Sequence, residues 1–184
     1  VQAKTVPPSF ERVLGALGKA AGLYASYGLT TAQDGRVTNG ELQLLNYGGQ
    51  LGFINIDVVG LADPGIAEEV LVKGQKVGPY TNHTRIGGYK LFLDGSPQGK
   101  TAWLSKPYYE VPEGYDADYC GFQLFPDEEV IRMCKLCLEN DWQLNVHCNG
   151  DAACEQLIRC YTKAIEETGL KKDLRPVMVH CQTV

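Results

Sequence analysis

Hydrophobic and polar residues follow two different periods along this chain. Apolar residues recurring every three to four positions predict helices, over 9–28, 38–52, 126–141 and 151–169, with a shorter helix and a loop over 64–78. Runs rich in branched and aromatic residues predict strands, over 29–35 (with a turn after it), 53–61, 85–95, 142–148 and 175–184. Strands that alternate with helices are typical of βαβ units and a parallel sheet.

Capping residues support the predicted helix boundaries. Ser9 can cap the first helix and Gly28 can end it, and Gly169 can end the last helix. Pro126 stands at the start of the 126–141 helix, and acidic residues follow in its first turn, where the helix dipole favours them. The capping residues and the hydrophobic periodicity therefore agree on where the helices begin and end.

Five predicted strands are too few for a closed barrel. A (β/α)8 barrel has eight strands and about 250 residues, whereas this chain has 184 residues and stops close to a strand end. We therefore predict an α/β fold that is a partial (β/α)8 TIM-type barrel, with residues 1–184 forming a single incomplete domain. The Pro-, Gly- and Tyr-rich segment 96–125 is too long for a plain connection, which indicates a functional loop.

Composition narrows the class of protein. Hydrophobic residues make up 44% and charged residues 21% of the chain, as in ordinary globular domains. The net charge of −5 disfavours nucleic acid and anionic membrane surfaces as partners. No apolar run approaches the roughly 20 residues that span a bilayer. We therefore expect neither a nucleic-acid partner nor a membrane partner.

The seven cysteines indicate a reducing compartment. An odd number cannot form a complete disulfide framework within one chain, and several lie inside apolar helix or strand patterns. We expect a cytoplasmic protein. Cys134 and Cys137 form a Cys-x-x-Cys motif, but it lies in a helical pattern without a second such motif. We predict that this pair is neither a zinc site nor a disulfide.

Two histidines mark the ends of consecutive predicted strands. His147 and His180 are separated by 33 positions, about one βα repeat, so they are expected at equivalent ends of neighbouring parallel strands about 4.8 Å apart. Strand alternation places each histidine on a face opposite the apolar valines that flank it. Lys90 has the same placement in its strand. Two imidazoles at this spacing can reach one metal ion.

Lys90 is unusual because it stands between apolar neighbours, where burial of a charged amine is costly. Three interpretations follow from the residues. Lys90 forms a salt bridge to Asp94 on the same strand face, or it is a Schiff-base lysine with a depressed pKa, or it is carboxylated by CO2 and binds metal.

Three segments together resemble the metal-dependent amidohydrolase superfamily, near the branch of the N-substituted formamide deformylases. They are GYKLFLDGSPQGKTAWLSKPY, LNVHCNGDAA and RPVMVHCQTV, and YGLTTAQDG is similar to the second barrel strand of that branch. The resemblance covers nearly the whole chain from Phe10 onward. It implies about strands two to six of the barrel, with one or two divalent metals, expected to be zinc, at the C-terminal strand ends.

The resemblance also implies roles for single residues. Lys90 would be a carboxylated bridging ligand, and His147 and His180 would be metal ligands. Asp94, Asp151 and Gln182 would contact the substrate or support the ligands. The reaction implied is hydrolysis of a C–N bond in a small amide- or formamide-type molecule, in which the metal activates a water.

The chain also departs from the family pattern. The His-x-His pair of strand one is absent, and the strand-eight aspartate would lie beyond Val184. We therefore expect that the chain alone has little activity, and that it self-associates or needs the missing part of the barrel. The alternatives are a non-catalytic globular fragment or interaction domain, and a Schiff-base enzyme that uses Lys90.

Overall fold

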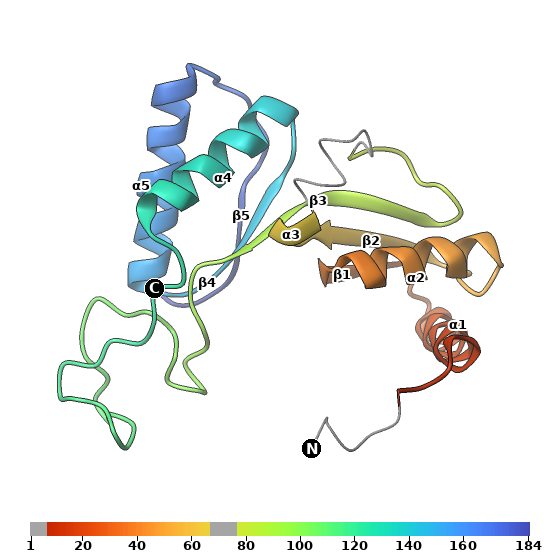
Figure 1. Cartoon of the computed structure of the whole chain (residues 1–184), viewed down its shortest axis with the longest axis horizontal. Helices are drawn as coiled ribbons and strands as arrows, with labels where there is room; N and C mark the ends of the chain where they lie inside the picture. Colours follow the sequence, from red (N-terminus) through yellow and green to blue (C-terminus); the bar gives the residue numbers. More distant parts are fainter. Residues whose placement is uncertain (1–6, 67–76) are drawn as a thin grey trace. The chain divides into compact units, whose positions relative to one another are not determined.

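The computed structural model describes residues 7–66 and 77–184 of the chain (Figure 1). Its strands are ordered as they occur in the sequence, β1-β2-β3-β4-β5, and the pairs β1–β2, β3–β4 and β4–β5 are parallel. Helices alternate with these strands. The predicted α/β fold, a partial TIM-type barrel, is confirmed. None of the described helices is long and apolar enough to cross a membrane.

Contacts within the chain divide it into two compact units, residues 1–87 and 88–184, with the boundary inside β3 (Thr84–Phe92). Unit 1 and unit 2 below denote these two ranges. The assignment of residues 1–184 to one domain stays a prediction.

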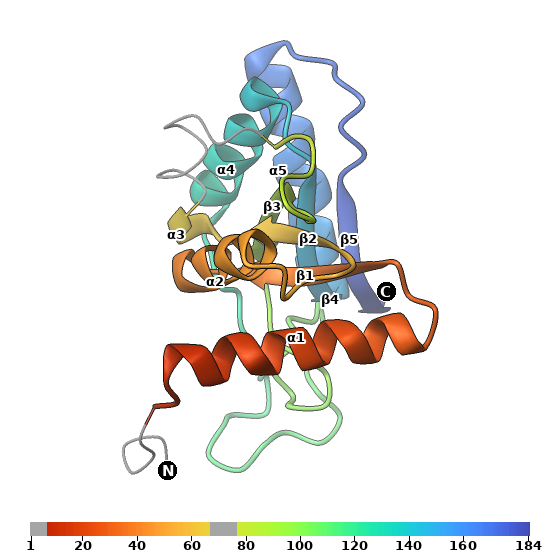
Figure 2. The same cartoon turned by 90° about the vertical axis from the view of Figure 1, so that its right-hand side faces the viewer.

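Unit 1 packs two helices near a pair of strands (Figure 2). Its elements are α1 (Phe10–Ser26), β1 (Thr31–Val37), α2 (Asn39–Gln50), β2 (Asp57–Ala62) and α3 (Pro64–Ile66). Ser9 caps α1 as predicted, by accepting from the Arg12 amide at 3.4 Å. Helices α1 and α2 touch where the Phe10 and Tyr47 rings meet edge to face at 5.9 Å between centroids. Of the predicted 64–78 segment, residues 67–76 lie outside the described part of the chain.

Two strand boundaries in unit 1 differ from those predicted. The turn expected after 29–35 is a β-bulge inside β1, because Asp34 pairs with Gly60 and Val37 with Ala62, which leaves one extra residue on β1. The second strand begins at Asp57 rather than at 53. The amides of Phe53 and Ile54 donate to the Gly48 carbonyl at the end of α2 instead of joining the sheet.

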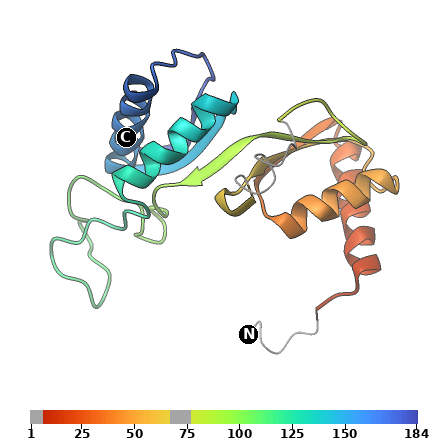
Figure 3. The ribbon, with the colours of Figure 1, turned by 45° about the horizontal axis from the view of Figure 1, so that its top comes forward.

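Unit 2 contains β3 from Gly88 onward, α4 (Asp127–Asn140), β4 (Leu144–Gly150), α5 (Asp151–Thr168) and β5 (Val177–Thr183). The two helices lie side by side next to β4 and β5 (Figures 1 and 3). Gly169, with φ 68°, ends α5 as predicted. The apolar face of β3 is fully buried at Tyr89 and Leu91, and β4 matches it with Leu144 and Val146 in register.

Candidate metal centre

The same three residues, Val-His-Cys, occur in both β4 and β5. The two strands pair in parallel, as expected, but their histidines are not in register. His147 is opposite Val179, and His180 is opposite Cys148. The two histidines therefore lie at the same end of neighbouring strands, with an offset of one residue in the register.

The two imidazole rings nevertheless meet. Their centroids are 4.7 Å apart and their planes are inclined by 80°. A bulge in β5 explains the contact, because Cys148 pairs with His180 but Gly150 pairs with Thr183, so β5 has one extra residue. His180 and Cys181 take positive φ angles of 76° and 48° at this bulge. A bulge of this kind turns a side chain away from its regular strand direction.

His147 is held by a backbone carbonyl. Its Nε2 lies 2.6 Å from the Gly95 oxygen, and its side chain is 14% exposed. A carbonyl oxygen only accepts, so the Nε2–H of His147 donates to Gly95 and Nδ1 is the nitrogen that can face a ligand. The Phe92 ring packs against the imidazole at 5.1 Å between centroids. The orientation of the His147 ring is therefore fixed, and Nδ1 is the nitrogen that Gly95 does not use.

His180 is exposed on β5, and the charges of neighbouring side chains act on its ring. Its pKa lies below the ordinary histidine value, first because the ring is partly desolvated and next because His147 and Lys90 add positive charge nearby. Asp94 opposes this effect. A neutral imidazole is the form that binds metal, so the surroundings favour that form.

Lys90 is buried, with 4% of its surface exposed. Its Nζ lies 4.8 Å from the centroid of the Phe92 ring, on the strand face that also carries His147. Burial lowers the pKa of the Lys90 amine, and the neighbouring Cys148 opposes this weakly. The salt bridge to Asp94 that the sequence left open is not formed, and no ion pair within the described residues involves Lys90.

Asp94 instead binds backbone amides. Its carboxylate accepts from the amides of Trp103 at 3.0 Å, Asn149 at 2.9 Å and Gly150 at 2.7 Å. The His147 Nε2 lies 3.5 Å from the same carboxylate. The residue is 2% exposed. Asp94 therefore joins the end of β3, the end of β4 and the 96–125 segment at one buried point.

Asp151 and Gln182 lie in different surroundings, since Asp151 is hydrogen-bonded and Gln182 is exposed. Asp151, the first residue of α5, accepts from the Ser105 amide at 2.9 Å and from the Ser105 hydroxyl. Burial alone would raise the pKa of Asp151, but the Ser105 hydrogen bonds and amides at the start of α5 outweigh it, and the pKa is lowered. This pair fixes the 96–125 segment to α5. Gln182 is exposed on β5.

The Cys-x-x-Cys pair lies on α4, as the helical pattern predicted. Cys134 and Cys137 are both fully buried. Burial raises the pKa of the Cys134 thiol to about 12, and it also raises that of Cys137. Such thiols behave as small apolar groups. The absence of zinc and of a disulfide there stays a prediction.

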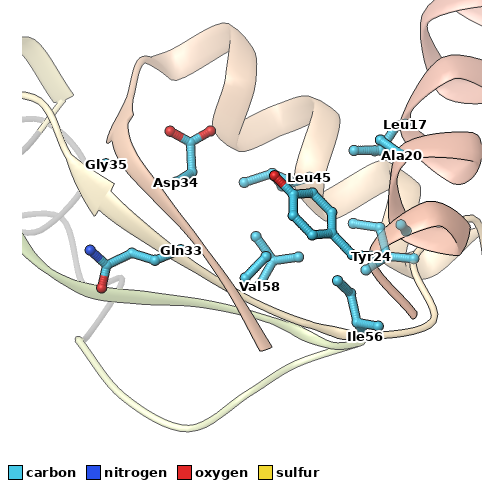
Figure 4. A pocket seen from close by; sticks show the side chains of 12 residues that line it. Leu17, Ala20, Tyr24, Gln33, Asp34, Gly35, Leu45, Ile56 and Val58 are labelled. Atoms are coloured by element: carbon cyan, nitrogen blue, oxygen red, sulfur yellow. The ribbon is translucent and has the colours of Figure 1, made fainter. Parts of the chain in front are cut away.

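Unit 1 contains cavities of its own. One of about 320 Å³ lies between α1, α2 and the two strands and is lined mainly by apolar side chains, with Asp34 its charged member. Figure 4 shows Tyr24 reaching from α1 toward Val58 and Leu45. Neither this cavity nor one of about 430 Å³ beside α2 contains a histidine or a cysteine. A third cavity of unit 1, of about 270 Å³, is lined by His83 and Asp57, which pair with each other at 2.9 Å. The expected metal ligands Lys90, His147 and His180 all lie in unit 2.

The structure thus gathers Lys90, His147, His180 and Asp94 at the ends of β3, β4 and β5. Among the described residues, no three His, Cys, Asp or Glu side chains group closely enough to hold a metal ion by themselves. A metal at this place needs Lys90, or a residue from elsewhere in the protein, as its third ligand. His83, the remaining histidine, lies in unit 1 and pairs with Asp57 at 2.9 Å.

Sequence reasoning missed three residues that support this centre. They are Gly95, whose carbonyl binds His147, Ser105, which binds Asp151, and Asn149, whose side chain contacts both Gly95 and His147. Asn149 stands two positions after His147, and the period of two could have identified it. The Ser105 contact depends on a loop path that no periodicity indicates.

The chain belongs to the amidohydrolase family, whose pattern matches residues 1–184. It is 31% identical over 107 residues to the putative amidohydrolase YtcJ of Bacillus subtilis (strain 168), covering 58% of this chain and 18% of that protein. Its fold is similar to two solved structures titled uncharacterized metal-dependent hydrolases. The one from Pyrococcus horikoshii OT3 has a TM-score of 0.70 at 24% identity. The one from Pyrococcus furiosus has a TM-score of 0.67 at 21% identity.

The matches cover most of this chain but little of its relatives. The solved structures align with 89% of this chain, which spans 32% and 33% of their lengths. The family and the fold of this chain are therefore established. The reaction of the whole protein is the subject of the proposal below.

Proposed function

We propose that this chain is part of a metal-dependent hydrolase that cleaves C–N bonds of small amide- or formamide-type molecules. The observation that carries the proposal is the buried Lys90 beside the paired rings of His147 and His180. Support comes from the family membership and from the metal-dependent hydrolases named among the similar structures. We place the protein in the cytoplasm, with residues 1–184 in one barrel domain that is completed by other parts of the protein or by self-association.

The residues fit a divalent metal. His147 offers Nδ1, because its Nε2 is bound to Gly95, and His180 offers a neutral ring. Lys90 would supply an anionic ligand after carboxylation, in which its neutral amine attacks CO2, forms a carbamate and releases one proton. Burial favours the neutral amine that this step needs. Imidazole and carboxylate-type oxygens suit zinc, and one or two ions are compatible with the ligand set.

A metal so held would polarise the scissile carbonyl and lower the pKa of a bound water. The residues of this chain have supporting tasks. Gly95 fixes the orientation of His147, and Asp94 holds together the strand ends that carry the ligands. Asp151 retains the 96–125 segment through Ser105. Gln182, which is exposed on the same strand as His180, would contact the substrate.

The proposal is tested on the full-length protein by metal analysis and by hydrolysis of N-formyl and N-acyl amines. We expect His147→Ala, His180→Ala and Lys90→Ala each to lower bound metal and to abolish turnover. His83→Ala is the matched control, because His83 pairs with Asp57 in unit 1. A wild-type protein without metal and without turnover would contradict the proposal and favour the non-catalytic alternative.

Schiff-base chemistry at Lys90 is a second candidate, because burial lowers the pKa of this amine. Reduction with borohydride in the presence of a carbonyl compound distinguishes the two. A stable adduct on Lys90 would support the Schiff base. Label from ¹³C-bicarbonate at Lys90, without an adduct, would support the carbamate.

A further inference from the structure

The cavity of about 430 Å³ in unit 1 lies between α2 and the start of β3. Its volume falls within the range of small-molecule sites in proteins. Three buried apolar side chains contribute to its lining, those of Leu42, Leu45 and Ile86. Most of the other lining residues are polar. The cavity therefore offers an apolar surface and a polar surface to the same ligand.

Arg85 gives the cavity a positive charge. It carries the one formal charge among the described lining residues, and none of these residues is acidic. Its side chain is exposed, and its Cζ lies 5.0 Å from the centroid of the Tyr80 ring. Arg85 forms no ion pair with another described residue. A guanidinium group that stacks on a ring keeps its N–H groups available at its edge. Arg85 is therefore able to pair with an anion that enters the cavity.

A rigid turn forms one wall of the cavity. The threonines at the two ends of residues 81–84 exchange backbone hydrogen bonds of 2.8 and 3.0 Å. Asn82 and His83 between them have φ angles of 49° and 64°, as in a type I′ turn. The turn packs directly on α2, because a Cβ at Gly49 would lie 2.2 Å from the Asn82 carbonyl oxygen. The shape of this wall is therefore set before a ligand binds.

The polar wall presents further hydrogen-bond donors. The Thr84 hydroxyl donates to Asn46 Oδ1 at 3.4 Å, so the Nδ2 group of Asn46 is the part of that amide left to bind elsewhere. Gln50 and Asn82 add two more side-chain amides to the lining. Since the charge is positive and amide donors surround it, the wall is suited to an anion.

We propose that this cavity binds a small carboxylate with an apolar body. The carboxylate would pair with Arg85, whose planar fork matches its two oxygens. The body would lie on the three buried apolar side chains, where it is removed from water. All the lining residues belong to unit 1, whereas the candidate metal ligands belong to unit 2. The proposal is therefore independent of the proposed function.

Phenylacetate is the probe, and calorimetry on the full-length protein measures its binding. Three compounds each change one property of the probe. 2-Phenylethanol has the ring without the charge, acetate has the charge without the ring, and inorganic phosphate is an anion of another shape. We expect phenylacetate to bind at least about tenfold more tightly than each of them, because it alone uses both surfaces of the cavity.

Variants locate the bound probe. Arg85→Gln should weaken phenylacetate binding at least about tenfold, and Arg85→Lys about threefold, because lysine keeps the charge but lacks the fork. Both changes are at an exposed side chain, so the protein should stay folded. Arg175→Gln is the matched control, since it removes the same charge from a side chain of unit 2 that is 81% exposed. It should leave the affinity unchanged.

A carboxylate could also bind a metal ion, so His147→Ala provides a second control. This variant damages the candidate metal centre and should bind phenylacetate as the wild type does. A loss of binding in His147→Ala with none in Arg85→Gln would assign the probe to the metal centre and overturn the proposal. Absence of binding to the wild type, or equal binding of 2-phenylethanol, would also overturn it. Phosphate or acetate that binds as tightly as phenylacetate would reject the apolar part of the site.

Discussion

The two Val-His-Cys segments of this chain have the same residues but unlike surroundings. In β4, Val146 and Cys148 are fully buried, and the His147 side chain is 14% exposed and bonded to Gly95. In β5, the valine and the cysteine are only partly buried, and the histidine is exposed. One segment lies between two strands, whereas β5 is the last strand of the sheet.

The difference shows how an identical local sequence acquires two roles. The first histidine is fixed by its neighbours before any ligand binds. The second owes its position to a bulge with two positive φ angles, and it meets the first through ring contact. The β4 segment is therefore the rigid half of the candidate centre, and the β5 segment is the half that depends on backbone conformation.

The largest expected effect comes from removing the anchor of the β4 end. Asp94→Ala leaves the buried amides of Trp103, Asn149 and Gly150 without their acceptor, and should lower the free energy of unfolding by about 3–5 kcal/mol. Asp94→Asn should recover less than half of this, because its NH2 group cannot accept. Asp118→Ala, at an exposed residue of the same loop, is the control. Urea unfolding of metal-depleted protein measures the effect, and equal stability of D94A and wild type would contradict the anchoring role.

The cysteines test the backbone difference directly. Cys148→Gly removes a fully buried side chain from an extended strand and should cost about 2 kcal/mol of unfolding free energy. Cys181→Gly should leave stability unchanged or raise it by up to about 1 kcal/mol, because glycine adopts positive φ without strain. Thermal unfolding of both variants provides the comparison. Similar losses at the two positions would show that the bulge is unimportant.

Without metal, His147 should contribute more than His180 to the free energy of unfolding. His147→Ala loses the Gly95 hydrogen bond and the packing on Phe92, and should cost about 1–2 kcal/mol. His180→Ala, on the exposed strand, should cost less than about 0.5 kcal/mol. Chemical denaturation in the presence of a chelator measures both. A larger loss at His180 would reverse the assignment of the rigid half.

The smallest expected effect concerns the bond that joins the two strands beyond the histidines. Thr183→Val keeps the shape of the side chain but removes the hydroxyl that donates to the Asn149 carbonyl, and should cost about 1 kcal/mol. The neighbouring Gln182→Ala should stay within about 0.5 kcal/mol of wild type. Hydrogen exchange at the β4 and β5 amides would locate the change. Unaltered protection at both strand ends in T183V would argue against this link.

The sequence by itself determined the order of the elements and singled out the candidate site residues. The period of two separated Lys90 from its apolar neighbours, and the βα spacing brought His147 and His180 to neighbouring strands. These features are local or repeat at fixed intervals, so they can be read from side-chain patterns alone. The predicted ends of α1 at Ser9 and of α5 at Gly169 were correct for the same reason.

The tertiary structure alone decided how those residues meet. The bulges at Asp34 and His180 arise from pairing with a neighbouring strand, and an Asp-Gly pair in β1 therefore marked an irregular strand instead of the predicted turn. The acceptors and donors that fix His147, Asp94 and Asn149 come from a loop whose path depends on long-range hydrogen bonds. Such contacts join residues more than 50 positions apart in some cases, such as Gly95 with His147, and their geometry follows from packing.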